Sequence, residues 1–290
     1  MPSDLVESAP AKVNLTLRVL GRRADGYHDI ESLVAFADVG DRLTLTPGNA
    51  LTLTVVGPGT AQTGAEADNL VIKATNALTA RVPGLRAGAF RLEKNLPVAA
   101  GVGGGSADAA AALRLLAQTN KLAPDDPRLH DAARATGADV PVCLDPRPRV
   151  MRGTGEILSA PVPLPRLAAL LVNPGVAVPT KLVFSGWKPS ANAPRPAERV
   201  ALPKMQNEEQ LLDWLASEAN DLEAPAIALA PAIAEVLVSL RAAAGCRLAR
   251  MSGSGATCFA LFSSAAESAA AGKKLRTQFP GWWISEMVLG

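Results

Sequence analysis

The chain has 290 residues, of which 48% are hydrophobic and 19% charged, and its formal net charge is +2. This composition is too apolar for a disordered chain, and the length is sufficient for more than one domain. The sequence has no basic run with interleaved aromatic residues, so nucleic acid is not expected as a partner. We expect a cytoplasmic protein without a membrane partner, because no signal-peptide pattern is found and prolines interrupt the longest apolar stretch, residues 224–240.

The three cysteines are Cys143, Cys246 and Cys258, and none of them belongs to a CxxC pair. Each is surrounded by apolar residues, which predicts buried, reduced thiols in a reducing compartment. The only histidines are His28 and His130, so a zinc site built from cysteine and histidine is not expected.

In the first half of the chain, alternating residues predict a half-buried strand over 12–19, with Lys12 and Asn14 on its polar face. Asp25-Gly26 marks a turn. The other elements expected in this half are strands at 42–46, 51–56 and 89–94, and helices at 69–81, 106–118 and 127–136. Gly137 ends the last of these helices, and Asp139 follows it closely.

A cluster of prolines between residues 146 and 165 marks a change of organisation, and we expect two domains, 1–155 and 156–290. The second half is predicted to contain strands at 168–173, 257–262 and 283–288, helices at 208–215, 226–244 and 265–278, and an exposed loop at 188–204. Because strands and helices are mixed without strict alternation, the predicted fold class is α+β.

A glycine-rich segment, Pro97-Val-Ala-Ala-Gly-Val-Gly-Gly-Gly-Ser106, lies between a predicted strand and a predicted helix. Glycines allow a ligand to approach the backbone closely, and the first N–H groups of the following helix are unpaired at the positive end of its dipole. The segment therefore indicates an anion site, although taken alone a flexible turn is equally compatible with it. It is not a Walker A loop, because no Gly-Lys-Ser/Thr follows, and it fits a dinucleotide fingerprint only loosely.

Three segments resemble, in order, motifs of the galactokinase–homoserine kinase–mevalonate kinase–phosphomevalonate kinase (GHMP) superfamily: Ala9–Leu15, Leu96–Ala112 and Met251–Thr257. The resemblance spans nearly the whole chain. It implies an N-terminal domain like the second domain of ribosomal protein S5, followed by a ferredoxin-like C-terminal domain. The chain departs from the superfamily loop at Val102, where leucine is frequent, and at Ser106-Ala107, where a serine pair is frequent.

Four further segments resemble the member family whose acceptor carries a cytidine diphosphate group, in the non-mevalonate isoprenoid pathway: Arg22–His28, Gly137–Pro141, Asn173–Val176 and Asn220–Glu223. The implied activity is transfer of a phosphoryl group from ATP to an alcohol, with ATP and Mg²⁺ as cofactors. A homoserine or mevalonate kinase is an alternative, but those acceptors have no base to stack. A nucleotide-binding regulator without catalysis and a dehydrogenase are alternatives from other classes.

The resemblance also implies roles for individual residues. Asp139 is the expected base, and Lys12 its activating partner. The phosphates of ATP are expected at Pro97, Val98, Ala99, Ala100, Gly101, Val102, Gly103, Gly104, Gly105, Ser106 and Ala107. The adenine is expected at Asn69, Leu70 and Lys94.

The cytidine-tagged substrate is expected at Asn14, Tyr27, His28 and Phe184. A tyrosine ring can stack on a pyrimidine, and a neutral imidazole offers one donor and one acceptor to a base edge. The metal ligands are not assigned, although Asp108 stands in the first turn of a predicted helix. The expected partner is a small-molecule substrate with a cytidine diphosphate group, and the expected state is a monomer or weak homodimer.

Overall fold

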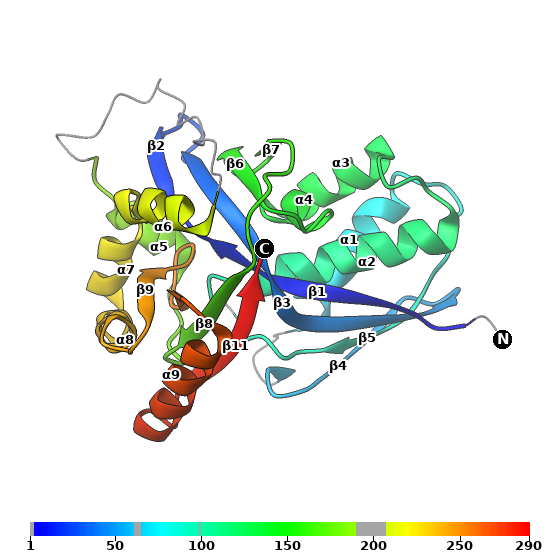
Figure 1. The fold of residues 1–290 in the computed structure, drawn as a ribbon. Helices are drawn as coiled ribbons and strands as arrows, with labels where there is room; N and C mark the ends of the chain where they lie inside the picture. The colour runs from blue at the N-terminus through cyan, green and yellow to red at the C-terminus, as the bar shows by residue number, and fades with distance from the viewer. Residues whose placement is uncertain (1–2, 61–64, 99, 190–206) are drawn as a thin grey trace. The chain divides into compact units, whose positions relative to one another are not determined.

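The computed structural model describes residues 3–60, 65–98, 100–189 and 207–290 (Figure 1). It divides into two compact units that are interleaved in sequence. Unit 1 contains Met1–Lys12, Asp38–Ala99 and Gly103–Pro146, and unit 2 contains Val13–Ala37, Ala100–Val102 and Arg147–Gly290. The expected domain boundary after residue 155 stays a prediction.

Unit 1 combines a sheet with a layer of helices. The strands are β1 (Leu5–Asn14), which belongs to this unit up to residue 12, β3 (His28–Gly48), which belongs to it from residue 38, β4 (Thr52–Val56) and β5 (Ala87–Glu93). β5 pairs antiparallel with β3 and parallel with β4. The helices are η2 (Glu66–Asp68), α1 (Leu70–Thr79), α2 (Gly104–Asn120), α3 (Pro127–Thr136) and α4 (Val140–Cys143). Helices α1, α2 and α3 lie on one face of this sheet (Figure 1).

Local sequence explains where these helices begin. The side chain of Asn69 accepts a hydrogen bond from the N–H of Val71, and Asp126 caps α3 in the same way, as asparagine and aspartate commonly do. Helix α2 differs from the prediction, because it begins at Gly104 and not at Ser106. Its N-cap, Gly103, has a φ of 64°, a left-handed conformation that glycine adopts at little cost, so the helix starts two residues earlier.

Unit 2 contains a β-α-β-β-α-β arrangement, which is the ferredoxin-like topology that was predicted. Its strands are β8 (Leu167–Asn173), β9 (Cys246–Met251), β10 (Cys258–Phe262) and β11 (Trp283–Leu289), in the antiparallel order β11-β8-β10-β9. Helices α8 (Ala232–Arg241) and α9 (Ala265–Gln278) pack on this sheet through one hydrophobic core. The unit also contains β2 (Arg18–Arg22), the start of β3, β6 (Arg149–Gly153), β7 (Ile157–Leu158), α5 (Thr180–Gly186), α6 (Glu208–Ser217) and α7 (Glu223–Leu229).

Several elements differ from the sequence-based expectation. The helix predicted over 226–244 is two helices, α7 and α8, because Pro231 stands between them at the N-cap of α8. The strand predicted over 12–19 ends at Asn14, and it is not half-buried, since Lys12 is 3% exposed and Asn14 1%. Strands β6 and β9 and helices α4 and α5 were not predicted.

The loop predicted at 188–204 lies almost entirely outside the described residues. All three cysteines are free thiols, as predicted, and burial raises the pKa of Cys143 to about 12. Cys246 is only half-buried. None of the helices in the described ranges has the length and hydropathy that a membrane span requires.

Candidate active site

The N-terminus of helix α2 is free of side-chain caps. Gly103 occupies the N-cap position, and among the described residues no side-chain cap hydrogen bond is made at the start of this 17-residue helix. The first N–H groups of a helix have no partner within it, and they lie at the positive end of the helix dipole. This turn can therefore bind a phosphate group through its backbone.

Because the three glycines at this turn, Gly103–Gly105, have no Cβ atoms, the side chains of three residues predicted for the site can pack close to the backbone. A Cβ atom added to the first would lie 3.3 Å from side-chain carbons of Lys12. A Cβ on the second would lie 3.4 Å from Nζ of Lys94, and one on the third 3.4 Å from Cδ1 of Leu70. Unit 1 therefore brings these predicted residues together around the start of α2.

Lys12 and Asp139 form an ion pair within unit 1. The Nζ of Lys12 donates to Oδ2 of Asp139 at 2.8 Å. The lysine side chain is 4% exposed, whereas the aspartate side chain is 37% exposed. Asp139 stands at the N-cap of α4 but does not cap it by a side-chain hydrogen bond. The pair thus combines a buried, fixed ammonium with a carboxylate that solvent or a ligand can reach.

Lys94 lies between two buried carboxylates. Its ammonium group donates to Oδ2 of Asp41 and, at 2.8 Å, to Oδ2 of Asp108. The other oxygen of Asp41 accepts the N–H groups of Asn95 at 2.6 Å and of Leu96 at 2.8 Å. Burial raises the pKa of Asp108 to about 7, against the attraction of the ammonium. The cluster therefore connects the segment that precedes the glycine-rich loop, residues 94–96, to helix α2, which follows the loop.

The middle of the glycine-rich loop packs within unit 2 against a second loop of small residues. Ser252 Oγ donates to the carbonyl of Gly101 at 3.1 Å, and the N–H of Thr257 donates to the carbonyl of Ala100 at 3.1 Å. Gly101 has a φ of 76°, and a Cβ there would lie 2.7 Å from the carbonyl oxygens of Ser252 and Gly255. No side chain fits at this position.

Asn14 is buried in unit 2 and has an unused acceptor. Its Nδ2 donates to Ser32 Oγ at 2.7 Å, and its N–H donates to Ser252 Oγ at 3.1 Å. Because Ser32 donates its own proton to the carbonyl of Thr16, the serine must accept from Asn14, which fixes the amide orientation. The Oδ1 of Asn14 is buried and then has no partner in the part of the protein that the structure describes. A buried acceptor without a partner is costly, and a substrate hydroxyl would satisfy it.

His28 belongs to an aromatic group in unit 2. Its ring stacks on Phe184, with centroids 5.1 Å apart at 29°, and meets the edge of Trp187 at 6.0 Å and 84°. Burial, and then the charge of Arg22, lower the pKa of His28, so the ring is neutral at neutral pH. Tyr27 is 64% exposed, and its ring contacts no other ring in the described part of the chain.

Comparison with known proteins identifies the family. The model of the GHMP kinases N terminal domain matches residues 69–145, and that of the GHMP kinases C terminal domain matches residues 200–281. A 4-diphosphocytidyl-2-C-methyl-D-erythritol kinase of Rhodopseudomonas palustris is 58% identical over 286 residues, which cover 97% of this chain and 95% of the relative. The kinase of the same name from Xanthobacter autotrophicus is 56% identical over 285 residues, 97% of each chain.

The chain belongs to the 4-diphosphocytidyl-2-C-methyl-D-erythritol kinase family of GHMP kinases. A crystal structure of a 4-(cytidine 5'-diphospho)-2C-methyl-D-erythritol kinase matches it with a TM-score of 0.76 at 35% identity and covers 99% of both chains. A homoserine kinase from Cytophaga hutchinsonii, with a TM-score of 0.67 at 20% identity, shares the fold. The predicted α+β GHMP fold is therefore confirmed, and as a GHMP kinase the chain uses ATP.

For a kinase of this family, the structure also places the remaining predicted residues. Val102 and Ala107 are each 1% exposed, so their side chains pack in the interior and leave only backbone for ATP. Pro97 and Val98 are half-buried, and Ala99 lies outside the described residues. Asn69 caps the helix that Leu70 begins. Contacts of these residues with ATP stay a prediction.

Sequence reasoning missed two features of the site. Trp187 is the first, and an available signal was its position three residues after Phe184. The second is the pairing of Lys94 with Asp41 and Asp108, because neither carboxylate is near the lysine in sequence. The ammonium group of Lys94 is thus occupied by protein partners, which its assignment to the adenine pocket did not anticipate.

Proposed function

We propose that this chain transfers the γ-phosphoryl group of ATP to the 2-hydroxyl of 4-diphosphocytidyl-2-C-methyl-D-erythritol, giving the 2-phosphate and ADP in the non-mevalonate isoprenoid pathway. One observation carries the chemistry: the Lys12–Asp139 ion pair lies beside the uncapped N-terminus of helix α2. Phosphoryl transfer requires a bound phosphate, charge neutralisation and a proton acceptor, and this part of unit 1 offers all three.

Asp139 accepts the proton of the acceptor hydroxyl in this proposal. A carboxylate is a weak base, but a loose transition state releases the proton late and requires little basicity. Lys12 holds the carboxylate in place through its 2.8 Å contact and stabilises the negative charge that develops on the oxygen. Because the 2-hydroxyl is tertiary and crowded, a fixed base is more effective than a mobile one.

The backbone of Gly103–Ser106 holds the phosphates of ATP in this proposal. The N–H groups of the first turn of α2 donate to phosphate oxygens, and the absence of Cβ atoms lets these oxygens approach closely. Asn69, Leu70 and Lys94 line the adenine pocket. Leu70 supports this assignment, because its side chain lies against the third glycine of the turn.

The cytosine of the substrate is bound by the aromatic group of unit 2. His28 is neutral and offers a donor and an acceptor to the base edge, while Phe184 provides an apolar ring face. Tyr27 is exposed and available for stacking. The Oδ1 of Asn14, which is buried without a partner among the described residues, accepts a hydrogen bond from a hydroxyl of the methylerythritol.

Magnesium is proposed as the ion that neutralises the ATP phosphates, because such ions are bound through one or two carboxylates together with phosphate and water. Among the described residues no group of three His, Cys, Asp or Glu side chains forms a metal cage. Asp108 is buried and its Oδ2 accepts from Lys94, while its Oδ1 has no partner among the described residues, so at most one oxygen of this carboxylate is free. We therefore assign no protein ligand and derive no catalytic step from the ion.

The test is ADP release by the purified protein with Mg-ATP and a panel of alcohols. Release with the cytidylyl methylerythritol, and not with homoserine or mevalonate, is the expected result. Turnover of either of those two alcohols in its place would contradict the proposal. Sedimentation of the same preparation checks the expected monomer or weak homodimer.

A further inference from the structure

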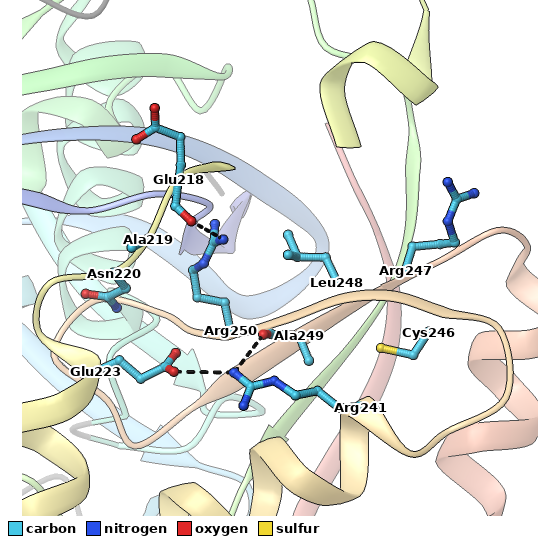
Figure 2. A pocket seen from close by; sticks show the side chains of 10 residues that line it. All are labelled: Glu218, Ala219, Asn220, Glu223, Arg241, Cys246, Arg247, Leu248, Ala249 and Arg250. Atoms are coloured by element: carbon cyan, nitrogen blue, oxygen red, sulfur yellow. Dashed lines mark hydrogen bonds and ion pairs between the residues drawn. The ribbon is translucent and has the colours of Figure 1, made fainter. Parts of the chain in front are cut away.

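A cavity of about 430 Å³ lies within unit 2 and contains none of the residues assigned above to catalysis, ATP or the cytidylyl substrate (Figure 2). It is lined by Glu218, Ala219, Asn220, Glu223, Arg241, Cys246, Arg247, Leu248, Ala249 and Arg250. Strand β9 supplies half of this lining, and among the described residues it is the last strand of its sheet, so the cavity lies along a strand edge that is free in this part of the chain. Its volume is within the range typical of small-molecule sites.

The wall of the cavity contains the guanidinium of Arg250, which forms no direct ion pair among the described residues, although the charges of Glu223 and Glu218 act on it from further away. Arg250 donates only to backbone carbonyls, those of Leu15 and Leu215 at 2.7 Å and that of Glu218 at 2.6 Å. Within the described ranges no carboxylate lies at ion-pair distance from it. Burial lowers the pKa of Arg250, but a guanidinium stays protonated in proteins, so the charge persists.

A second guanidinium is only loosely held. The side chain of Arg241 is 54% exposed, and its Nη2 lies 3.4 Å from Glu223 Oε1 and 3.4 Å from the carbonyl of Ala249. Both distances are longer than those of good hydrogen bonds. A stronger acceptor could therefore bind the guanidinium of Arg241 with little loss of existing interaction energy. The carboxylate of Glu218 points away from Arg241 and Arg250 (Figure 2).

The free edge of β9 adds a backbone donor. The carbonyl of Ala249 faces Arg241. In an antiparallel strand the N–H and C=O of one residue point to the same edge, so the N–H of Ala249 also faces the cavity side. Two guanidinium groups and an N–H are the groups that bind phosphate, and the nearby side chains of Leu248 and Ala219 provide apolar surface for an organic substituent.

The same lining residues hold the loop that packs against the glycine-rich segment. Asn220 Nδ2 donates to the carbonyls of Met251 and Gly253, both at 2.8 Å. Glu223 Oε2 accepts the N–H of Met251 at 3.0 Å. Glu223 therefore contacts both Arg241 and Met251, the last residue of β9 directly before that loop, and an anion that draws Arg241 away changes the electrostatic surroundings of the contact.

We propose that this cavity binds a small phosphorylated metabolite through its phosphate group, with Arg241 and Arg250 as counter-charges. Occupancy alters turnover, because Glu223 and Asn220 connect the cavity to the loop at Met251–Gly253. Arg247 of the lining already pairs with Glu209 at 2.7 Å, so the positive charges available to an anion are those of Arg250 and of the weakly held Arg241.

Binding is tested by calorimetry on the full chain, saturated with a non-hydrolysable ATP analogue and the cytidylyl substrate so that their phosphate sites are filled. The probes are glycerol 3-phosphate, inorganic phosphate and glycerol. Both phosphates should bind and glycerol should not, and tighter binding of glycerol 3-phosphate would identify an organic phosphate as the preferred source. Equal binding of the two would show that free phosphate is sufficient, which still supports the phosphate site.

The decisive variant is Arg241→Ala, with Arg91→Ala as its matched control. The two side chains are similarly exposed, 54% and 52%, and each contacts one glutamate, but Arg91 lies on β5 in unit 1. Arg241→Ala should weaken phosphate binding about 10-fold or more, as expected for a charge-assisted contact, while Arg91→Ala should leave it unchanged. Absence of phosphate binding in the saturated wild type, or equal binding by Arg241→Ala, would overturn the proposal.

Coupling is tested by kinetics. Glycerol 3-phosphate at a saturating concentration should change kcat in the wild type and in Arg91→Ala but not in Arg241→Ala. A wild type that binds the probe without any change in kcat would refute the connection through Glu223 and Asn220. Thermal melts of the variants without ligand distinguish loss of the site from loss of the fold.

Discussion

The Nζ of Lys12 lies 2.8 Å from Oδ2 of Asp139, although 127 positions separate the two residues in sequence. Strand β1 contributes the lysine and the turn before α4 contributes the aspartate. The lysine side chain is buried in unit 1, whereas the carboxylate of the aspartate is partly exposed. This asymmetry is suited to a base that must meet a substrate while its counter-charge remains fixed.

Asp139→Asn and Lys12→Ala should each reduce kcat at least ~100-fold, because one removes the proton acceptor and the other the charge that positions it. ATP binding should remain nearly intact, since the phosphates are assigned to backbone groups of α2. Single-turnover phosphorylation and equilibrium ATP titration measure the two effects. Asp131→Asn, at an exposed aspartate of α3 in the same unit, is the matched control. Near-normal turnover by either variant would reject the assigned role.

His28→Ala should raise the KM for the cytidylyl substrate far more than the KM for ATP, because the imidazole is assigned to the cytosine. The other histidine, His130, lies on α3 and is half-buried, so His130→Ala serves as the control. Steady-state kinetics with each substrate varied in turn provide the measurement. A similar rise in both KM values would show that the imidazole of His28 supports the fold and does not bind the cytosine.

The pH dependence of substrate binding follows from the same histidine. Burial and Arg22 lower its pKa from 6.5, so the neutral ring persists to a more acidic pH than in free histidine. Protonation removes the acceptor nitrogen, and KM for the cytidylyl substrate should therefore rise only below pH 6.5. Titration of the ring by NMR, alongside KM, checks this. A ring that titrates above 6.5 would contradict it.

Gly101→Ala should destabilise the protein by about 1–3 kcal/mol or more, because the residue would have to keep a left-handed φ. The added Cβ would also lie 2.7 Å from two backbone oxygens. Gly281→Ala is the control, since a Cβ there meets no atom within 4 Å. Urea unfolding measures stability, and ATP titration shows whether the loop still binds phosphate. Equal stability of the two variants would mean that the loop adapts freely.

Asp108→Asn should change how stability depends on pH. Burial raises the pKa of Asp108 from 3.8 to about 7, so between these values the folded chain holds a proton that the unfolded chain has released. The stabilisation is full below 3.8 and is lost as pH rises through about 7. The variant lacks this proton, so its free energy of unfolding should fall less steeply across that range.

Unfolding by urea at several pH values measures the slope. Asp68→Asn is the control, because the side chain of Asp68 is 79% exposed and also pairs with a lysine. The control should keep the wild-type slope. If the slope for Asp108→Asn is also that of the wild type, the two carboxylates around Lys94 do not hold an extra proton.

Much of the local structure was predictable because its causes are local. Helix α3 occupies the predicted residues 127–136, since Asp126 caps it and Pro127 suits a first helical position. Helix α9 likewise matches the prediction at Ala265–Gln278. Prediction failed at the start of α2, because the sequence pattern did not reveal that Gly103 takes the left-handed N-cap conformation.

By itself, the sequence predicted an anion-binding loop and determined the α+β fold class, because glycine spacing, caps and periodicity act over a few neighbouring residues, and its motifs resemble those of GHMP kinases. The tertiary structure decided the partners. It placed Asp139 against Lys12, enclosed Lys94 between Asp41 and Asp108, and stacked His28 on Phe184. These pairings arise from the burial of charged and aromatic groups brought together by strand pairing and helix packing, and such contacts are not encoded in the spacing of neighbours.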